Sequence, residues 1–414
     1  MKNLIFCFLF LSCAHHSSTK NHIMFVVDGM GPAHITGARL FKGGPEARLA
    51  IENMPYTGIV RTASTNDFVT DSAASATAFA TGVKTYNRSI GLSDPRLETS
   101  GEARELNSIL SAAKAAGKSV GIVSSTRITH ATPAAYFARV PHRNMEEEIA
   151  NQLLAAKVDL IIAGGASYFK PQSLGGKRKD QLNLFDQFKA AGYQILSTDK
   201  EIFESSSPQP ILALLNDDHL PYDLERKENL ELKDYVDFAI KYLSKNPNGY
   251  FLVVEAGRVD HASHLNQVRL ALGDMLAMDR AVERALDEKK NTLIVVTADH
   301  ETGGLALNGY APHDAVTGER LFKNHKRDLV QEKFNHGFIS WGSGPGFHSP
   351  IRVDESVLDF QHKATYETPI AYHTAVDVPV MAAGPGAEIF TGFHSIEQIV
   401  ALSAKILGLD LNNE

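Results

Sequence analysis

The sequence predicts an α/β fold: a three-layer α/β/α sandwich with a mostly parallel central sheet and one inserted lobe. Short apolar runs recur along the chain and are mostly continuous rather than alternating, which is typical of strands buried on both faces. Segments with helical periodicity lie between these runs, and this alternation favours a parallel or mixed sheet covered on both sides. A stretch rich in Gly, His, Pro and charge, at about 308–370, breaks the rhythm and is interpreted as an insertion.

The composition is typical of a soluble globular protein. The chain has 414 residues, of which 43% are hydrophobic and 21% charged, ordinary values for such proteins. This length is long for one domain but within the range of a single large α/β enzyme. The net charge is −7 and there is no basic run, which argues against binding to nucleic acid or to an anionic membrane surface.

Residues 1–20 have the layout of an export signal followed by a tether. The apolar run from Leu4 to Leu11 is too short to span a bilayer permanently. The segment FLSC resembles a bacterial lipobox, which favours a lipoprotein anchored through Cys13 on the periplasmic side; a plain cleaved signal peptide is the alternative. The only other cysteine, Cys7, lies in the same leader, so the mature domain is expected to have no internal disulfide.

Residues 21–414 are expected to form one domain, and seven apolar runs predict its strands. In chain order these are HIMFVVDG, SVGIVSS, VDLIIAGG, YQILS, YFLVVEAG, NTLIVVTAD and DVPVMAAG. Helices are predicted over 103–117, 144–157 and 268–288, where apolar residues recur with helical spacing. The segment 205–222 is expected to be irregular.

Acidic residues and histidines stand where several of these strands end. In open parallel sheets the ligand crevice lies beyond the carboxyl ends of the strands. Asp28 taken alone is equally well explained as a helix cap or a loop anchor. Convergence of several such residues at one edge favours a site instead. They are Asp28, His130, Thr132, Glu255, Asp299 and His300.

The densest cluster, EAGRVDHASH, predicts a metal site. Asp260 and His264 are four residues apart and would face the same way on a helix, where they provide a carboxylate and an imidazole for Zn²⁺. A helical ion pair is the alternative for these two residues alone. The full set of metal-binding candidates is too large for one tetrahedral zinc and fits two or three ions, with Zn²⁺ at sites containing histidine and Mg²⁺ at an all-oxygen site. The set is Asp28, Glu255, Asp260, His264, Asp299, His300 and His373.

Ser72 is the candidate nucleophile. It opens an Ala-rich run, AASATAFATG, that is predicted to be helical until Gly82. A serine at a helix N-terminus faces unpaired N–H groups that favour an anion, and an adjacent metal ion can activate its hydroxyl. Taken locally, Asp71 or Ser72 is more simply an N-cap. Together with the predicted metal cluster, the nucleophile is favoured.

The chain resembles the alkaline phosphatases, a family of metal-dependent phosphomonoesterases. The resemblance covers about Ile23 to the C-terminus and rests on six motifs in the family's order. These are DGMG, VTDSAASATAFATGVKTYN, THATPAAYFARVPHRN, VVEAGRVDHASH, TADHETGG and YHTAVDV. The insertion at 308–370 stands in the place of the family's crown-like lobe, without a match at the level of residues.

The resemblance implies a role for each candidate residue. Ser72 would form a phosphoserine during hydrolysis of small phosphate monoesters, and Arg143 would grip two phosphate oxygens. From the residues alone Arg143 could not be preferred over Arg139. The implied ligands are Asp260, His264 and His373 for one zinc; Asp28, Ser72, Asp299 and His300 for a second; and Asp28, Thr132 and Glu255 for a magnesium.

Two positions put the third metal in doubt. Members of the family have Asp and Lys at the positions of His130 and His261 in some cases and His in others, and this chain has His at both. His130 near the magnesium site would add a nitrogen ligand, so either Mg²⁺ or Zn²⁺ fits there. The remaining histidines are assigned to the surface or packing of the insertion: His313, His325, His336, His348 and His362.

Two other functions compete with a phosphomonoesterase. The first is a related enzyme on the same scaffold: a phosphodiesterase, a nucleotide pyrophosphatase or a sulfatase. Phosphodiesterases on this scaffold use a Thr nucleophile and lack the arginine, and sulfatases need a C/S-x-P-x-R context that DSAASA does not provide. A non-catalytic, metal-loaded surface lipoprotein would have no reason to keep the nucleophile Ser72. Because many members of the family form homodimers, a homodimer is the expected assembly.

Overall fold

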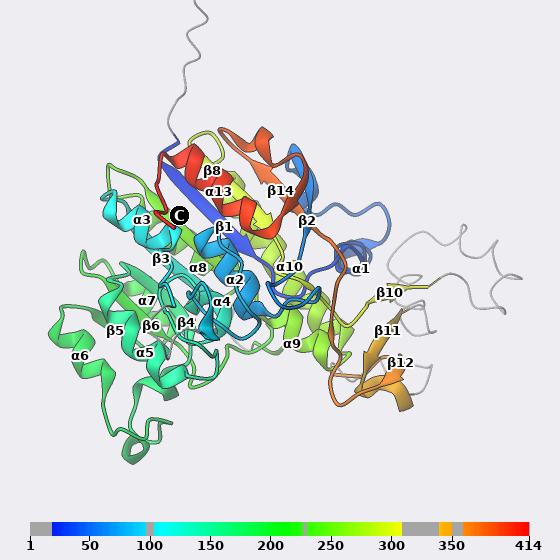
Figure 1. The fold of residues 1–414 in the computed structure, drawn as a ribbon, viewed down its shortest axis with the longest axis horizontal. Helices are drawn as coiled ribbons and strands as arrows, with labels where there is room; N and C mark the ends of the chain where they lie inside the picture. The colour runs from blue at the N-terminus through cyan, green and yellow to red at the C-terminus, as the bar shows by residue number, and fades with distance from the viewer. Residues whose placement is uncertain (1–18, 97–102, 227–229, 309–338, 350–358, 414) are drawn as a thin grey trace, which may run out of the picture.

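A ten-stranded sheet forms the centre of the protein (Figure 1). The structure is a computed structural model and describes residues 19–96, 103–226, 230–308, 339–349 and 359–413. The strand order is β15-β2-β14-β8-β1-β7-β3-β4-β6-β5. The strands are β1 (Asn21–Val26), β2 (Tyr56–Arg61), β3 (Ser119–Arg127), β4 (Leu160–Gly164), β5 (Gln194–Leu196), β6 (Ile211–Leu214), β7 (Tyr250–Glu255), β8 (Thr292–Thr297), β14 (Val378–Ala383) and β15 (Gly392–Ser395).

The register of this sheet aligns the ends of its central strands. β1 lies between β7 and β8 and is parallel to both. Val26, its last residue, pairs with Glu255 on one side and with Thr297 on the other. The acidic residues that follow these strands therefore meet at one edge. Only β14 runs antiparallel to its neighbours, β8 and β2, among the pairings described.

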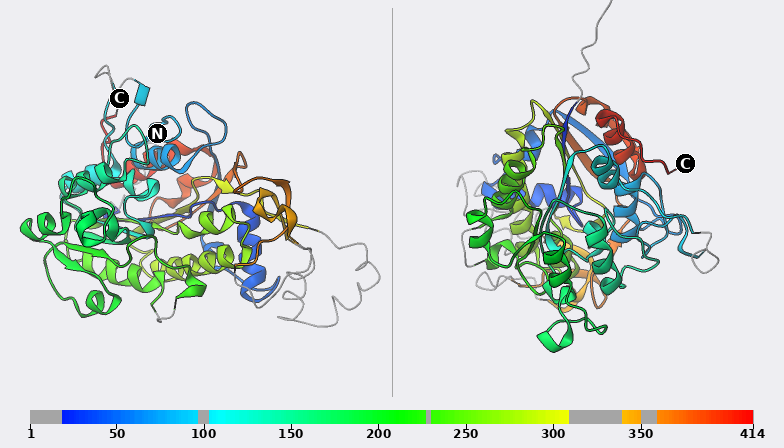
Figure 2. Two further views of the ribbon diagram at one scale, coloured as in Figure 1. Left: turned by 90° about the horizontal axis from the view of Figure 1, so that it is seen from below. Right: turned by 90° about the vertical axis from the view of Figure 1, so that its left-hand side faces the viewer.

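Helices cover both faces of the sheet and produce the predicted three layers (Figure 2). One face is covered by α8 and α10, with α1 packed on α10; the other is covered by α2, α3 and α13. The longer helices are α1 (Pro32–Gly43), α2 (Ser72–Thr81), α5 (Glu146–Ala155), α8 (Leu232–Leu243), α10 (Val268–Leu286) and α13 (Ile396–Leu407). The shorter ones are α3 (Ile109–Ala115), α4 (Ala131–Ala134), α6 (Leu184–Ala190), α7 (Asp199–Glu204) and α9 (Arg258–His264).

The sequence predicts seven of the ten strands of the central sheet. All seven predicted runs contain a strand, and each of the three predicted helical segments contains a helix. The expectation that 205–222 is irregular is wrong at β6, whose four buried residues, ILAL, are too short a run to stand out. β2 and the edge strand β15 are not predicted either, because exposed positions interrupt their apolar pattern.

The described parts of the predicted insertion form a small separate sheet. It has the order β10-β11-β12, with β10 (Ala306–Leu307), β11 (Ile339–Gly344) and β12 (Ala364–Glu367). Trp341 is buried there, and its ring lies 5.9 Å from that of His34 on α1. His362 is buried in the same lobe and His348 lies near its surface. His313, His325 and His336 lie outside the described residues.

A second small pairing brings two distant histidines together. β9 (Glu301–Thr302) and β13 (His373–Thr374) run antiparallel, so His373 lies opposite Thr302. His300 directly precedes β9, and its ring stacks on that of His373 with centroids 3.5 Å apart.

The predicted leader lies almost wholly outside the described residues. Its lipidation candidate, Cys13, belongs to the range 1–18, and the described chain begins with Thr19 and Lys20 before β1. Within the ranges that the structure describes, no helix is both long enough and apolar enough to cross a membrane.

Candidate metal centre

Three groups of side chains gather beyond the carboxyl ends of the central strands. In each group the potential ligand atoms lie within 4.8 Å of one another. Gly29, with a φ of 83°, allows the turn after β1 to approach α9, because a Cβ there would lie 2.7 Å from the Cα of Asp260. The groups are Asp260, His264 and His373; Asp28, Asp299 and His300; and Asp28, His130 and Glu255.

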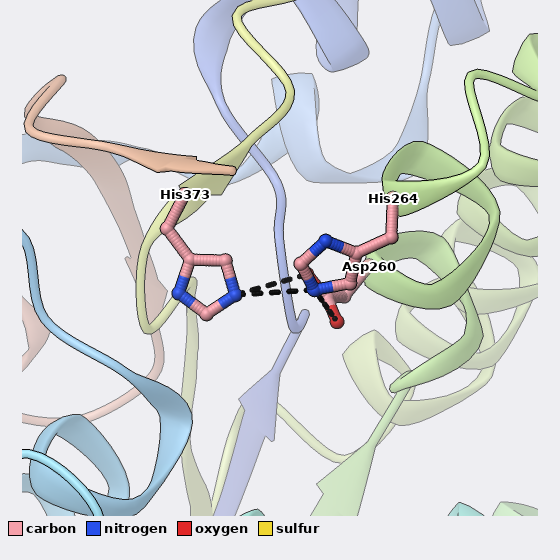
Figure 3. Close-up of side chains that lie close together, drawn as sticks. All are labelled: Asp260, His264 and His373. Carbon is pink, nitrogen blue, oxygen red and sulfur yellow. Dashed lines mark hydrogen bonds and ion pairs between the residues drawn. The ribbon is translucent and has the colours of Figure 1, made fainter. Parts of the chain in front are cut away.

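The first group joins α9 to β13 (Figure 3). The predicted helix carries Asp260 and His264 on one face, and their Oδ2 and Nε2 atoms are 3.2 Å apart. The Nε2 of His373 lies 3.3 Å from that of His264 and 3.6 Å from Oδ1 of Asp260. Three potential ligand atoms therefore face one point.

Hydrogen bonds on the far side of each ring determine which nitrogen faces that point. The Nδ1–H of His264 donates to the carbonyl of Ala371 at 2.5 Å, and the Nδ1–H of His373 donates to the carbonyl of Thr70 at 3.0 Å. In neutral rings both Nε2 atoms then carry lone pairs. Two lone pairs facing each other beside a carboxylate favour a cation between them, which is the arrangement of metal-binding histidines.

The second group surrounds the hydroxyl of Ser72. The Nε2 of His300 lies 3.2 Å from Oδ2 of Asp299 and 3.6 Å from Oδ1 of Asp28. It also lies 3.2 Å from Oγ of Ser72. The distances bring the candidate nucleophile directly against a candidate metal group.

Thr302 connects the first two groups. Its hydroxyl donates to Oδ1 of Asp260 at 2.5 Å and accepts from the Nδ1–H of His300 at 3.2 Å. His300 is thereby held as the tautomer whose Nε2 lone pair faces Ser72 and the two aspartates.

The third group is richer in oxygen. Thr132 donates to Oδ2 of Asp28 at 3.4 Å, and Nδ1 of His130 lies 3.8 Å from Oε1 of Glu255. The other oxygen of Glu255 accepts from the hydroxyls of Ser124 and Thr126. Asp28 belongs to both the second and the third group, so its two oxygens face two different points.

Several buried polar atoms at this edge have no hydrogen-bond partner among the residues that the structure describes. They are Oδ1 of Asp28, Nδ1 of His130, Oε1 of Glu255 and Oδ2 of Asp299. A buried polar atom without a partner costs free energy. All four atoms point into the candidate groups, and bound cations would satisfy the three carboxylate oxygens among them. The residues present therefore fit metal ions.

The pKa shifts agree with an excess of negative charge. Burial raises the pKa of Asp28 well above its ordinary value, and the charges of Asp299, Asp260 and Glu255 raise it further. Burial, with Asp260 and Glu255 adding to it, raises the pKa of Asp299 to about 8. For Asp260 burial acts upward, but His264 and His373 outweigh it and lower its pKa. A cation would relieve the repulsion among the carboxylates.

Ser72 is the first residue of α2. Asp71 is its N-cap and accepts a hydrogen bond from the backbone N–H of Ala74 at 3.0 Å. The small residues of α2 are buried throughout, and the helix ends at Gly82 with a φ of 75°. The local prediction of an N-cap is therefore correct for Asp71, and Ser72 is left facing His300.

Arg143 lies beside this helix. Its Nη1 donates to Oδ2 of Asp71 at 3.2 Å, and its Nη2 lies 3.1 Å from Nε2 of His130. Arg139 is different: its guanidinium donates to the carbonyls of Leu106 and Phe137. The structure thus distinguishes two arginines that the residues alone did not.

Some residues at this edge were missed from the sequence. Thr302 holds Asp260 and His300 in place, but Asp260 is remote from it in sequence. Asp71 holds Arg143 as well as capping α2, and the sequence indicates only the cap. His261 lies against His219, with ring centroids 4.4 Å apart, and its Nδ1 contacts Arg258 at 2.9 Å. His219 gave no signal, because its loop was expected to be irregular.

Comparisons with known proteins agree with this geometry. The family model described as alkaline phosphatase matches residues 19–409. An alkaline phosphatase of Gadus morhua is 33% identical over 93% of this chain and 91% of its own. The tissue-nonspecific isozyme of human alkaline phosphatase is 33% identical, and the match covers 94% of this chain and 84% of the human sequence. A membrane-bound alkaline phosphatase of Bombyx mori is 34% identical over 91% of this chain and 78% of its own.

Solved structures give the same result. The alkaline phosphatase of the Antarctic bacterium TAB5 superposes with a TM-score of 0.73 at 27% identity, covering 95% of this chain and 99% of its own. The enzyme of Thermus thermophilus superposes with a TM-score of 0.74 at 28% identity, covering 95% and 92%. A TAB5 variant, with a histidine replaced by glutamate, was solved with Mg bound in its M3 site.

Proposed function

The chain belongs to the alkaline phosphatase family and is a phosphomonoester hydrolase, and we propose that it works through a phosphoserine at Ser72 beside two zinc ions and one magnesium ion. The observation that carries this proposal is the contact of 3.2 Å between Oγ of Ser72 and Nε2 of His300 at the N-terminus of α2. A hydroxyl there meets unpaired N–H groups of the helix and a metal-binding nitrogen at once.

Three metal positions follow from the three groups of side chains. Imidazole nitrogens favour Zn²⁺ in the first two groups, whereas oxygen ligands favour Mg²⁺ in the third. We assign Asp260, His264 and His373 to the first zinc; Asp28, Ser72, Asp299 and His300 to the second; and Asp28, Thr132 and Glu255 to the magnesium. The ions, when bound, supply Lewis-acid stabilisation of the reacting oxygens and lower the pKa of a coordinated hydroxyl.

His130 supports magnesium rather than zinc at the third position. Its Nε2 lies 3.1 Å from Nη2 of Arg143, which can only donate. The neutral ring then carries its proton on Nδ1, the atom that faces Oε1 of Glu255. A protonated Nδ1 cannot be a metal ligand, but it can donate to the water molecules that Mg²⁺ retains.

The residues of the chain supply binding, orientation and nucleophilic attack. Arg143 offers parallel donors to two oxygens of the phosphoryl group, while Asp71 holds its guanidinium toward the site. Ser72 attacks phosphorus in line, and the leaving alcohol departs from the opposite side. Water then hydrolyses the phosphoserine and releases inorganic phosphate. Catalysis of this kind is mainly positioning and electrostatic stabilisation.

Acid quenching during turnover tests the covalent step. Peptide mapping by mass spectrometry is expected to find phosphate on Ser72 in the wild type and no phosphopeptide in Ser72→Ala. Phosphate on another residue, or none at any quench time or pH, would contradict the proposed intermediate.

Export and assembly are part of the same proposal. We propose that the protein is an exported, periplasmic-side lipoprotein attached through Cys13, and that it forms a homodimer. The Bombyx mori relative, named as membrane-bound, gives a precedent for a membrane-attached relative. Cys13→Ala should release the protein from the membrane fraction, and a wild type that already fractionates as soluble contradicts the anchor. Sedimentation velocity tests the dimer.

A further inference from the structure

Two hydrogen-bond donors face each other beside Arg143 with no acceptor between them. Nη1 of Arg88 lies 3.5 Å from Nε2 of His142. The backbone N–H of Asn144 donates to Nδ1 of His142 at 3.1 Å, so Nδ1 is an acceptor. The neutral ring therefore carries its proton on Nε2, and Arg88 can only donate. The contact joins two donors, which an anionic oxygen would satisfy together.

Arg88 has no acidic partner for its guanidinium within the described ranges of the chain. Its backbone N–H donates to both carboxylate oxygens of Asp71, at 3.1 and 3.0 Å, but its side chain makes no ion pair there. Arg96, by contrast, pairs with Asp94 at 2.6 Å. An exposed, uncompensated guanidinium beside a phosphate site favours an incoming anion.

The backbone holds Arg88 at this place against its own preference. Its φ is 77°, in the left-handed region that is unfavourable for a residue with a Cβ. Its carbonyl accepts from the backbone N–H of Arg143 at 2.7 Å. Arg88 is thus tied to Asp71 and Arg143, the two residues that frame the phosphoryl site. Backbone strain of this kind is found preferentially at functional sites.

We propose that Arg88 and His142 form a second anion subsite, which binds a further phosphoryl group of the substrate next to the one that is cleaved. The preferred substrates are then diphosphates, either inorganic pyrophosphate or the terminal phosphate of a nucleoside diphosphate. This inference deepens the proposed function and rests on it.

The chemistry at the reacting phosphorus is unchanged. Oγ of Ser72 forms a bond to the terminal phosphorus, and the bond between that phosphorus and the bridging oxygen breaks. The hydroxyl proton of Ser72 passes to water. The bridging oxygen leaves with the second phosphoryl group, whose charge Arg88 and His142 stabilise. Water then cleaves the phosphoserine to inorganic phosphate, so no oxidant or further reactant is needed.

Calorimetric titration with methylenediphosphonate, a diphosphate analogue that cannot be cleaved, tests the subsite on the metal-loaded protein. Arg88→Gly is the main variant, because glycine adopts the positive φ without strain. The dissociation constant of this variant for methylenediphosphonate is expected to be about tenfold higher than that of the wild type, whereas its dissociation constant for inorganic phosphate stays within about twofold of the wild-type value. His142→Asn keeps an acceptor for the N–H of Asn144, and its dissociation constant for methylenediphosphonate is also expected to rise.

Arg96→Ala is the matched control. Arg96 lies over the ring of Tyr86, two residues from Arg88, so the variant removes one positive charge from the same region. It is expected to leave both dissociation constants unchanged. Equal weakening of phosphate and methylenediphosphonate in Arg88→Gly, or no weakening of either, overturns the subsite. These binding measurements test only the subsite. The proposed function is tested by activity, and it would be refuted if the wild type failed to hydrolyse monoesters.

Discussion

The carboxylate of Asp71 accepts a hydrogen bond from Nη1 of Arg143 at 3.2 Å while it caps the helix that begins with Ser72. One side chain thus holds both the proposed nucleophile's helix and the proposed phosphate-binding guanidinium. Asp71 also accepts from the backbone N–H of Arg88. Its charge and its capping geometry can be separated by substitution.

Asp71→Asn removes the charge and keeps the cap, since asparagine caps helices about as well as aspartate. We expect weaker inhibition by inorganic phosphate, with an inhibition constant raised severalfold, and a nearly unchanged melting temperature.

Arg143→Ala should weaken phosphate inhibition further and should also lower turnover. Unchanged phosphate inhibition in Arg143→Ala would remove this residue from the phosphoryl site.

Ser72→Ala should lower turnover of p-nitrophenyl phosphate by at least about a thousandfold, because it removes the proposed nucleophilic atom. Metal content and melting temperature should stay close to those of the wild type. Ser75→Ala is the matched control: Ser75 is buried on the same helix, and its hydroxyl donates to the carbonyl of Asp71 at 2.8 Å. Comparable losses in both variants would indicate damage to the helix rather than loss of a nucleophile.

Glu301 is expected to position two histidines of the proposed zinc sites. Its carboxylate accepts from Thr374 at 2.5 Å and from the backbone N–H of Gly304 at 3.1 Å, which joins β9, after His300, to β13, which carries His373. Its other oxygen accepts from the backbone N–H of Leu305 at 3.1 Å. Because glutamine has only one amide oxygen, Glu301→Gln loses the acceptor on one side and should lower the zinc affinity about tenfold. Competition with a chromophoric chelator measures that affinity.

Asp279→Asn is the control for Glu301→Gln. Asp279 is buried on α10, accepts from the backbone N–H of Ile51 at 3.1 Å and pairs with Lys42 at 3.2 Å. Its substitution should lower the melting temperature without changing zinc affinity. If Glu301→Gln likewise loses only thermal stability, Glu301 is a structural residue and does not position the zinc ligands.

Asp274 is expected to make the folded protein less stable as the pH rises from about 4 to about 7. Burial raises its pKa to about 7 in the folded protein, above the ordinary value for a carboxyl group. The folded state therefore binds more protons than the unfolded state between about pH 4 and pH 7, and stability falls as pH rises through that range. Asp274→Asn cannot ionise, so above pH 7 it should be more stable than the wild type by on the order of a few kcal/mol. Urea unfolding at pH 5 and pH 9 measures the difference; equal differences at both pH values would contradict it.

The sequence was informative where burial imposes a pattern. Strands such as β1, β7 and β8 are buried along their whole length, so their continuous apolar runs stood out. β2 alternates between exposed and buried positions, and β15, at the sheet edge, is mostly exposed, so no apolar run marks either strand. Pairing with neighbours, which the sequence does not display, determines those strands.

The metal-binding candidates were visible because parallel strands end at a common edge. Asp28, Glu255 and Asp299 follow three adjacent strands, and the pattern alone brought them together. The supporting residues were not visible. Thr302 donates to Asp260, 42 residues away in sequence, and nothing around Thr302 indicates that contact. Arg88 and His142 are 54 residues apart and meet only through the fold.

The most direct test of the central claim is hydrolysis of p-nitrophenyl phosphate beside bis-p-nitrophenyl phosphate at alkaline pH. Each substrate would be assayed before chelation, after it, and after adding back Zn²⁺ and Mg²⁺. We predict fast cleavage of the monoester that chelation abolishes and the metal ions restore. Preference for the diester, or no metal-dependent cleavage of either substrate, would contradict a metal-dependent phosphomonoesterase with Ser72 as its nucleophile.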